Sequence, residues 1–379
     1  MLACRRAHQF KLTTSLSTSI RRRRNPSVNI KVVGVGGGGS NALTRMYRSR
    51  IPSVEYIAAN TDAQALAHTE ASIRLRVGDR IAGGLGVGGN PQIGRECFLD
   101  SREEIREVLS GADLVFIAAG MGGGTGTGGA PVVANIAKRE LGCLTIGVIT
   151  KPFPFEGYQR DQQAAEGLKR LAEEVDTMIV IPNERLLLVS APDTSVEVAF
   201  RMADEVLRQG IQSITELLLL PGEINLDFAD LRTVMRDAGP AWMAIGKGNG
   251  IDRTDAAITS VLSSPLLEVK IDGATGVLLN ITSGPDLMMA EVRKISETVK
   301  QQVHPDAEII FGTTQDLRME NELKITIIAT GFEDISDVDA YGEERAQKAQ
   351  EALETGSDLN IPPSHRSIER EYQRFLRGR

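Results

Sequence analysis

Short apolar runs alternate with amphipathic stretches through the first half of the chain. The apolar runs are rich in Val, Ile and Ala, as buried strands are, and lie at 30–36, 54–60, 111–120, 143–150 and 177–183. Apolar residues at helical spacing follow at 41–49, 131–140 and 161–175, with Pro131 expected in a first helical turn. This alternation predicts an α/β fold with a mostly parallel sheet and helices on both faces.

A long helix is expected between this region and a second alternating region. Apolar residues keep helical spacing over 194–220. Beyond it the pattern restarts, with helices expected at 254–265 and 287–303 and strands at 276–284, 307–313 and 323–332. We therefore expect a first α/β domain at 30–193, a central helix at 194–220 and a smaller α/β domain at 221–332.

The two ends of the chain differ in composition from the middle. Residues 1–29 contain no acidic residue, many Ser and Thr, and a run of four arginines at 21–24. We expect a disordered basic arm there, and an organellar transit peptide or a start assigned too far upstream are the alternatives. Residues 333–379 turn polar and are expected to form a linker and a tail.

Composition and charge narrow the class of protein. The formal net charge of −7 and the pI of about 5.4 argue against a nucleic-acid binder that relies on bulk charge. The three cysteines lie far apart and the four histidines lack ligand-like spacing, so neither a disulfide framework nor a zinc site is expected. No apolar run approaches the roughly 18 residues that span a bilayer, so we expect a soluble, cytoplasmic protein without a transmembrane segment.

Three glycine-rich segments follow predicted strands and are candidates for phosphate binding. The first, "GVGGGG" at 34–39, matches the dinucleotide fingerprint and has Asp62 about 20 residues downstream. The second is "GGGTGTG" at 122–128, and the third lies within 84–94. Between a strand end and a helix start, free backbone N–H groups attract anions. We therefore expect a polyphosphate site at the carboxyl edge of the sheet, and the alternative is a set of tight turns that pack helices on strands.

The phosphate loop is not of the Walker type. The sequence GxxxxGK[ST] is absent, and Lys247 is followed by Gly248. Backbone dipoles and a bound Mg²⁺ must therefore neutralise the polyphosphate, and the sequence does not identify the metal ligands. A Rossmann-type oxidoreductase is a rival interpretation of the first segment, but it leaves the other two glycine segments unexplained.

Five motifs resemble, in order and spacing, those of FtsZ, the tubulin-like GTPase family of bacterial cell division. They are "GGGGSN" (36–41), "NTD" (60–62), "GGGTGTG" (122–128), "KPFPFEG" (151–157) and "NLDFADLRTVM" (225–235). The resemblance extends from about Ile30 to Phe332. It implies a tubulin-like fold with a GTP-binding domain, a long central helix and a second, smaller α/β domain. It also implies GTP hydrolysis activated by self-assembly, and head-to-tail filaments that form the ring at the division site.

The resemblance assigns nucleotide contacts to matching positions. Phosphate contacts fall on Gly37, Gly38, Gly39, Ser40 and Asn41 in the first segment and on Gly124, Thr125 and Gly126 in the second. Glu156 and Arg160 fall on the ribose side of GTP or GDP, and a surface ion pair at helical spacing is the alternative. Phe200 and Asp204 are four residues apart on the expected central helix and face the same way. The ring would stack on guanine and the carboxylate would accept from the base, although an isolated Phe200 is more often core.

Asp227 and Asp230 are three residues apart, with Asn225 just ahead at the position of a helix cap. Taken alone, this pattern indicates a capped helix start with acids near the helix dipole. The resemblance implies that this loop completes the nucleotide site of a neighbouring subunit. The two acids would orient and polarise the attacking water, and Asn225 would contact the nucleotide. A non-hydrolysing tubulin-like partner is the remaining alternative, and the three intact polar residues argue against it.

The sequence departs from the family pattern mainly at its tail. Gly129 stands where the family mostly has alanine. The tail peptide that docks on membrane-anchor and regulatory proteins is split here into "LNIPP" (359–363) and "FLRGR" (375–379). Four apolar residues of the tail fall on one helical face: Ile368, Tyr372, Phe375 and Leu376. They favour a partner-docking helix or a membrane-surface helix, and a frayed tail is the alternative.

Overall fold

The computed structural model describes residues 28–332, except 50, 52, 189, 192, 221, 225, 265 and 267–270. The predictions for residues 1–27 and 333–379, including the basic arm and the partner-docking tail, lie outside the described residues. The expected contact residue Asn225 also lies outside them.

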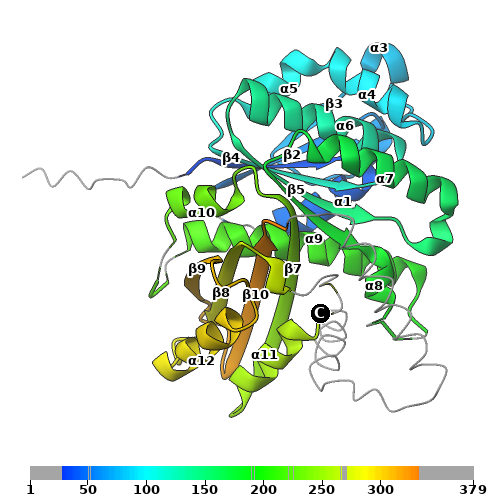
Figure 1. Ribbon diagram of the computed structural model, residues 1–379. Coiled ribbons are helices and arrows are strands. Elements are labelled where there is room, and N and C mark those ends of the chain that lie inside the picture. Colours follow the sequence, from blue (N-terminus) through cyan, green and yellow to red (C-terminus); the bar gives the residue numbers. More distant parts are fainter. Residues whose placement is uncertain are drawn as a thin grey trace, which may run out of the picture.

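The described strands join one sheet of ten, in the order β3-β2-β1-β4-β5-β6-β7-β10-β8-β9 (Figure 1). The strands are β1 (Ile30–Val35), β2 (Val54–Asn60), β3 (Ile73–Arg76), β4 (Leu114–Gly120), β5 (Leu144–Lys151), β6 (Thr177–Pro182), β7 (Gly239–Asn249), β8 (Gly276–Ser283), β9 (Glu308–Gln315) and β10 (Glu322–Thr330). From β3 to β7 neighbouring strands run parallel, whereas β10 is antiparallel to both β7 and β8. The predicted α/β class and mostly parallel sheet are confirmed, although the prediction lacks β3 and β7.

Helices cover both faces of the sheet (Figure 1). They are α1 (Gly36–Ser49), α2 (Ala63–Ala67), α3 (Asp79–Ala82), α4 (Pro91–Asp100), α5 (Arg102–Leu109), α6 (Gly124–Asn135), η1 (Ile136–Glu140), η2 (Pro154–Glu156), α7 (Tyr158–Ala172), α8 (Asn183–Leu187), α9 (Val196–Leu219), α10 (Phe228–Met235), α11 (Arg253–Leu262), η3 (Ile271–Gly273) and α12 (Met289–Lys300). Helices α1, α9 and α10 pack into one apolar cluster, and α4 to α7 into a second on the other face. Successive strand residues alternate between the two clusters, as Val32 and Val33 do.

The central helix α9 spans the junction between the two halves of the sheet. Strands β6 and β7 pair at only three positions, Thr177 to Ile179 with Gly239 to Ala241, whereas β7 and β10 pair at nine. At Gly210, α9 comes close to both halves: a Cβ there would lie 3.2 Å from the sulfur of Met243 in β7 and 3.5 Å from Val148 in β5. A third apolar cluster, with α11 and α12, supports the second half.

Two helices begin earlier than the sequence predicts. Helix α6 begins at Gly124, and Pro131 lies inside it rather than in its first turn. Helix α1 begins at Gly36 rather than near Asn41. The glycines that were expected to form loops therefore build the first turns of two helices. The prediction is wrong here because a run of glycine normally disfavours helix, and tertiary contacts override that preference.

Close backbone contacts explain these helical glycines. A Cβ on Gly126 would lie 2.5 Å from the carbonyl oxygen of Gly120, at the end of β4. A Cβ on Gly128 would lie 2.1 Å from the carbonyl oxygen of Pro91, in α4. Side chains at these positions would force α6 away from β4 and α4. Helix–sheet and helix–helix packing, which the sequence offered as an alternative to phosphate binding, is therefore part of the reason for the glycines.

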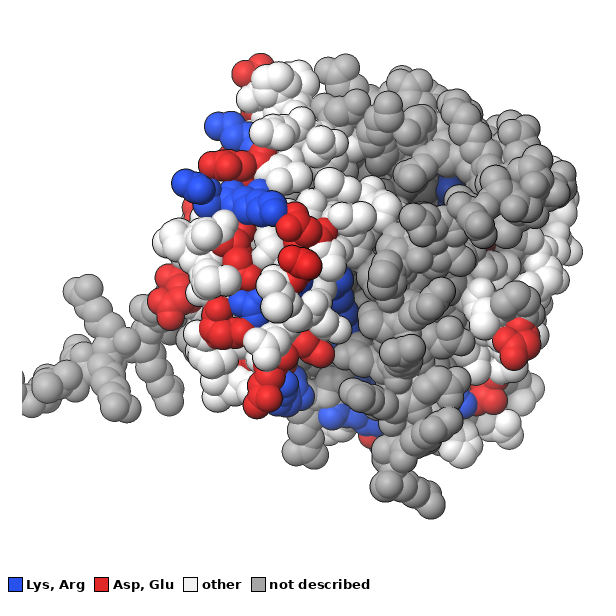
Figure 2. Space-filling view, turned by 90° about the horizontal axis from the view of Figure 1, so that it is seen from below, with Lys and Arg blue, Asp and Glu red and all other residues white. Residues whose placement is uncertain are grey.

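Figure 2 shows the side of the molecule that lies lowest in Figure 1. Acidic and basic side chains are interspersed over the described part of this face. In the same half, Lys294 of α12 pairs with Asp255 of α11 at 2.6 Å. The described part of this face therefore lacks the single-sign basic surface that nucleic acids bind. None of the helices in the described residues is both long and apolar enough to cross a membrane.

Replacing Gly128 by alanine should destabilise the protein. In a helix interior, alanine ordinarily makes the protein about 1 kcal/mol more stable than glycine does. Without the α4 contact, the substitution would therefore raise the free energy of unfolding. The clash with Pro91 should reverse the sign and lower the free energy of unfolding by about 1–3 kcal/mol. Urea denaturation measures this difference. The matched control is Gly123→Ala, where a Cβ meets no atom within 4 Å; a Gly128→Ala protein as stable as the control would contradict the packing argument.

Candidate functional site

The glycine-rich segments meet at the carboxyl edge of the parallel strands. Gly36 follows β1, and a Cβ on it would lie 2.8 Å from the backbone nitrogen of Gly126 in α6. Thr61, directly after β2, has its hydroxyl 2.7 Å from that of Thr125. Three crossover connections therefore converge on one point, which is where parallel sheets bind ligands.

The third glycine segment packs beside the other two. The N–H of Gly86 donates to the carbonyl of Thr61 at 3.3 Å. A Cβ on Gly124 would lie 2.5 Å from the Val87 side chain and 2.8 Å from the nitrogen of Asn90. Asn90 itself caps α4 by accepting from Gln92. The segment at 84–94 thus belongs to the same edge, as the sequence indicates.

Two helix N-termini point their free N–H groups at this edge. Helix α1 has 14 residues and α6 has 12, and neither carries an acidic side chain in its first turn. Gly37 and Gly38 are exposed, whereas Gly39 and Ser40 are buried. The buried hydroxyl of Ser40 finds no hydrogen-bond partner among the described residues. Positive dipole ends without a local carboxylate are suited to an anion.

Thr127, in the second glycine segment, has a structural role that the sequence analysis did not identify. This side chain is buried, and its hydroxyl accepts from the N–H of Gly122 at 2.9 Å. It thereby fixes the turn that precedes α6. The signal in the sequence was the second threonine of "GGGTGTG".

Asp62 is engaged in a structural role. Its carboxylate caps α2 and accepts from the N–H groups of Gln64 at 2.8 Å and Ala65 at 3.1 Å. In a dinucleotide fingerprint the corresponding acid must be free to bind a ribose hydroxyl. The capping contacts therefore weaken the oxidoreductase interpretation.

Glu156 and Arg160 lie beside the second glycine segment. Their side chains form an ion pair of 2.5 Å at helical spacing, and the Glu156 carboxylate also accepts from the N–H of Phe153 at 2.9 Å. A Cβ on Gly122 would lie 2.8 Å from the carbonyl of Arg160. The ion pair expected as the alternative is present, and it stands next to the candidate phosphate site.

An aromatic group surrounds Phe200 on α9. Its ring meets that of Phe153 edge-on, with centroids 5.2 Å apart, and that of Phe155 at 6.2 Å. Phe200 is 39% exposed and Phe155 is 55% exposed, so this is not a closed core. The sequence singled out Phe200 alone; the two phenylalanines of "KPFPFEG" carried the signal for the rest.

Asp204 lies one turn beyond Phe200 and pairs with Arg45 of α1 at 3.2 Å. Burial raises the pKa of Asp204 to about 6, against the opposing effect of the Arg45 cation and its hydrogen bond. The carboxylate is therefore held in a partly desolvated place in the N-terminal half of α9. Arg45 was not identified from the sequence, because its partner Asp204 lies 159 residues further along the chain.

Asp227 and Asp230 lie far from this edge. The 24 residues of α9 place its two ends about 36 Å apart, and α10 follows the distal end. Thr177, the first residue of β6, donates its hydroxyl to the carbonyl of Met235 at the end of α10, so α10 lies at the amino edge of the sheet. Asp227 is the N-cap of α10 and accepts from the N–H of Ala229. The cap is therefore Asp227, not the expected Asn225.

No group of three or more His, Cys, Asp or Glu side chains in the described part of the chain is arranged to hold a metal ion. A cation at the phosphate site would have to be held by oxygens of another kind. The hydroxyls of Ser40 and Thr125 are present at this edge, and the remaining oxygens would come from a nucleotide and from water.

Comparisons with known proteins agree over most of the chain. The model of the Tubulin/FtsZ family, GTPase domain, matches residues 29–191, and that of the FtsZ family, C-terminal domain, matches residues 239–333. The structure is similar to an empty FtsZ dimer from M. jannaschii, with 43% identity, a TM-score of 0.78, and coverage of 81% of this chain and 89% of that one. A point mutant of that FtsZ gives the same identity and TM-score, with 92% of its chain covered. CetZ2 from Haloferax volcanii, in a GTPγS-bound protofilament, shares the fold at 21% identity and a TM-score of 0.71, over 86% of this chain and 100% of that one.

The raised pKa of Asp204 predicts a specific dependence of stability on pH. The folded value of about 6 lies above the ordinary 3.8, so the folded protein binds this proton more tightly than the unfolded chain does. As the pH rises from about 4 to about 6, the free energy of unfolding of the nucleotide-free protein should therefore fall, by an amount on the order of 2 kcal/mol. Asp204→Asn should remove that fall, so its stability relative to wild type rises over this window and is constant above it.

Urea denaturation at a series of pH values measures the difference. The control is Asp306→Asn, on an exposed turn before β9, which should keep the wild-type dependence. Parallel pH profiles for wild type and Asp204→Asn would contradict the proposed desolvation.

Proposed function

From the premise that this chain belongs to the Tubulin/FtsZ family, we propose that it is a GTPase that polymerises head-to-tail into filaments and forms the ring at the cell-division site. The premise rests on the 43% identity to FtsZ over most of both chains and on the match to the FtsZ type of C-terminal domain. Identity to CetZ2 is about half as high, which favours the division role over that of the CetZ relatives.

GTP and GDP would bind with their phosphates on the two glycine-rich helix starts. The first turn of α1 would contribute Gly37, Gly38, Gly39, Ser40 and Asn41, and that of α6 would contribute Gly124, Thr125 and Gly126. Support comes from the convergence of the two N-termini and from first turns that carry no acid. A bound Mg²⁺ would supply neutralisation of phosphate charge, with Ser40 and Thr125 as the nearby protein oxygens. Glu156 and Arg160 would lie on the ribose side.

Guanine would be recognised at the start of α9. The half-exposed Phe200 and Phe155 offer rings for stacking, and the Asp204 carboxylate would accept from the two N–H donors on the Watson–Crick edge of guanine. Adenine presents a different pattern there and would leave the carboxylate without donors. Binding of the base would require Asp204 to be ionised and to share or release Arg45.

The observation that carries the catalytic proposal is the distance between the two sets of residues. Asp227 and Asp230 lie at the start of α10, the helix whose other end contacts the amino edge of the sheet, whereas the glycine helices lie at the carboxyl edge. We expect that one chain cannot bring them together, because α9, a helix of about 36 Å, lies between them in the sequence and cannot be compressed. A head-to-tail neighbour would place its amino edge on this chain's carboxyl edge. Asp227 and Asp230 would then position the water that attacks the γ-phosphate, with Asn225 contacting the nucleotide across the interface.

The same contact, repeated without closure, generates a filament. Hydrolysis would then follow assembly, and GDP would weaken the contact in which it sits. Membrane-anchor and regulatory proteins would bind the tail at 333–379, in the cytoplasm at the division site. The first domain would comprise 30–193, the central helix 194–220 and the second domain 221–332.

Phosphate release from GTP should show a threshold in protein concentration. With Mg²⁺ present, we expect little turnover per chain below the threshold and a rising rate per chain above it, because the active site forms only between subunits. A coupled phosphate assay across a dilution series measures this. Turnover per chain that stays constant with concentration would contradict the shared site, and the absence of any turnover would favour the non-hydrolysing tubulin-like partner.

Two inactive variants should restore activity to each other. Asp227→Asn keeps its nucleotide site but lacks an acid, and we expect its turnover to fall about a hundredfold. Asp204→Ala keeps Asp227 but should bind GTP poorly. In a random equimolar mixture, half of the nucleotide sites are intact and half of those face intact acids, so about one quarter of wild-type turnover should return.

Co-sedimentation of the two chains verifies that they share filaments. The control is a chain with both substitutions, which should not restore activity to Asp227→Asn. A mixture that is no more active than the average of its two components would exclude catalysis across the interface.

A further inference from the structure

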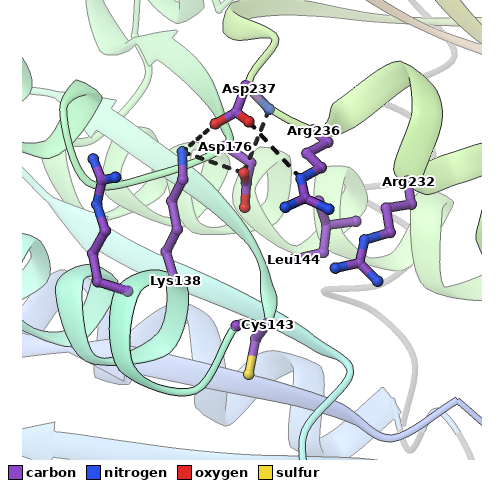
Figure 3. Close-up of a pocket in the computed structure, with 9 residues that line it drawn as sticks. Lys138, Cys143, Leu144, Asp176, Arg232, Arg236 and Asp237 are labelled. Atoms are coloured by element: carbon purple, nitrogen blue, oxygen red, sulfur yellow. Dashed lines mark hydrogen bonds and ion pairs between the residues drawn. The ribbon is translucent and has the colours of Figure 1, made fainter.

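A cavity of about 250 Å³ lies at the amino edge of the sheet, opposite the glycine helices (Figure 3). The end of α10 forms one wall with Arg232 and Arg236. The other walls come from η1, the start of β5 and the residues just before β6, with Lys138, Cys143 and Asp176. Nothing in the proposed GTPase cycle uses this cavity.

The acidic residues of the cavity are already engaged by its lysine. Lys138 lies 2.6 Å from the carboxylate of Asp237 and 3.2 Å from that of Asp176, and it also donates to the carbonyl of Val175. Figure 3 shows Lys138, Asp176 and Asp237 joined in this way on one side of the cavity. Lys138 offsets one of the two carboxylate charges, so one negative charge remains for the arginines that line the cavity.

The positive charges of Arg232 and Arg236 have few carboxylates near them. Among the described residues, Arg236 reaches one carboxylate, that of Asp237, at 3.9 Å. Arg232 forms no ion pair within the described residues, and its Nε is buried without a hydrogen-bond acceptor among them. A buried guanidinium N–H without an acceptor costs free energy. The cavity therefore carries two guanidinium groups that the described carboxylates satisfy poorly.

The arrangement of these arginines fits an oxyanion. Arg232 lies in the last turn of α10 and Arg236 directly follows that helix, and both line the cavity, where like charges repel unless an anion lies between them. Guanidinium groups bind phosphate and carboxylate oxygens through paired N–H donors. The cavity is smaller than the roughly 300–1,000 Å³ of pockets for larger organic ligands, so a compact anion suits it better than a nucleotide.

We propose that this cavity is a binding site for a small oxyanion, of the phosphate or carboxylate class, held between Arg232 and Arg236. The anion accepts from the guanidinium groups of Arg232 and Arg236, and it ties the last turn of α10 to η1 and β5. The site does not depend on the proposed GTPase function.

Isothermal titration calorimetry on the full chain tests the site, with inorganic phosphate and citrate as separate probes at constant ionic strength. Saturating GDP is present throughout, so that the glycine helices do not compete for the anion. We expect saturable binding to the wild type, and about tenfold weaker binding to both Arg232→Gln and Arg236→Gln. Binding of phosphate alone or of citrate alone supports the site and identifies the class of anion.

The variants are chosen to keep the test decisive. Arg236 has a side chain that is 60% exposed, so Arg236→Gln should fold even if Arg232→Gln does not. Arg293→Gln, an exposed arginine on α12, is the matched control and should bind as the wild type does. The absence of saturable binding, or equal affinity in wild type and Arg236→Gln, would overturn the proposal.

Discussion

The backbone of α6 lies in direct contact with the backbones of β4 and α4, and the rest of the site depends on that contact. It is possible only because Gly126 and Gly128 carry no side chain. The contact brings the N-terminus of α6 to the end of β1, where Gly36 opens α1. Two helix dipoles thereby converge, and the surrounding threonines and the third glycine segment are arranged around them. Close packing and the convergence of two helix N-termini are thus two results of the same absent side chains.

The central helix α9 separates two groups of candidate functional residues along the molecule. One end of α9 presents Phe200 and Asp204 beside the glycine helices, and the other leads to Asp227 on α10. Because a helix has a fixed rise per residue, the two ends cannot approach each other. Phe200 and Asp204 are therefore separated from the acids of α10 by a rigid helix, and under the proposed function they would meet only through another copy.

The sequence predicts the strands and the central helix well, because buried parallel strands and an amphipathic helix have strong periodic signals. The start of α6 was wrong by seven residues, since the propensity of glycine and the position of Pro131 both favour a later start. Residues that act across long stretches of chain, such as Arg45 on Asp204, leave no local pattern. Gly129 is similar: the ring of Phe98, 2.4 Å from where its Cβ would lie, explains the small residue only once α4 is in place.

The pairing around β7 also makes the molecule mechanically uneven. A ladder of three residue pairs joins β7 to β6, whereas nine join it to β10. If tension pulls the two halves apart, the shorter ladder has fewer hydrogen bonds to share the load and shears first. The strain then falls on α9, which at Gly210 touches a strand from each side. Under such tension we expect the ladder between β6 and β7 to open first, while the two halves of the sheet keep their fold.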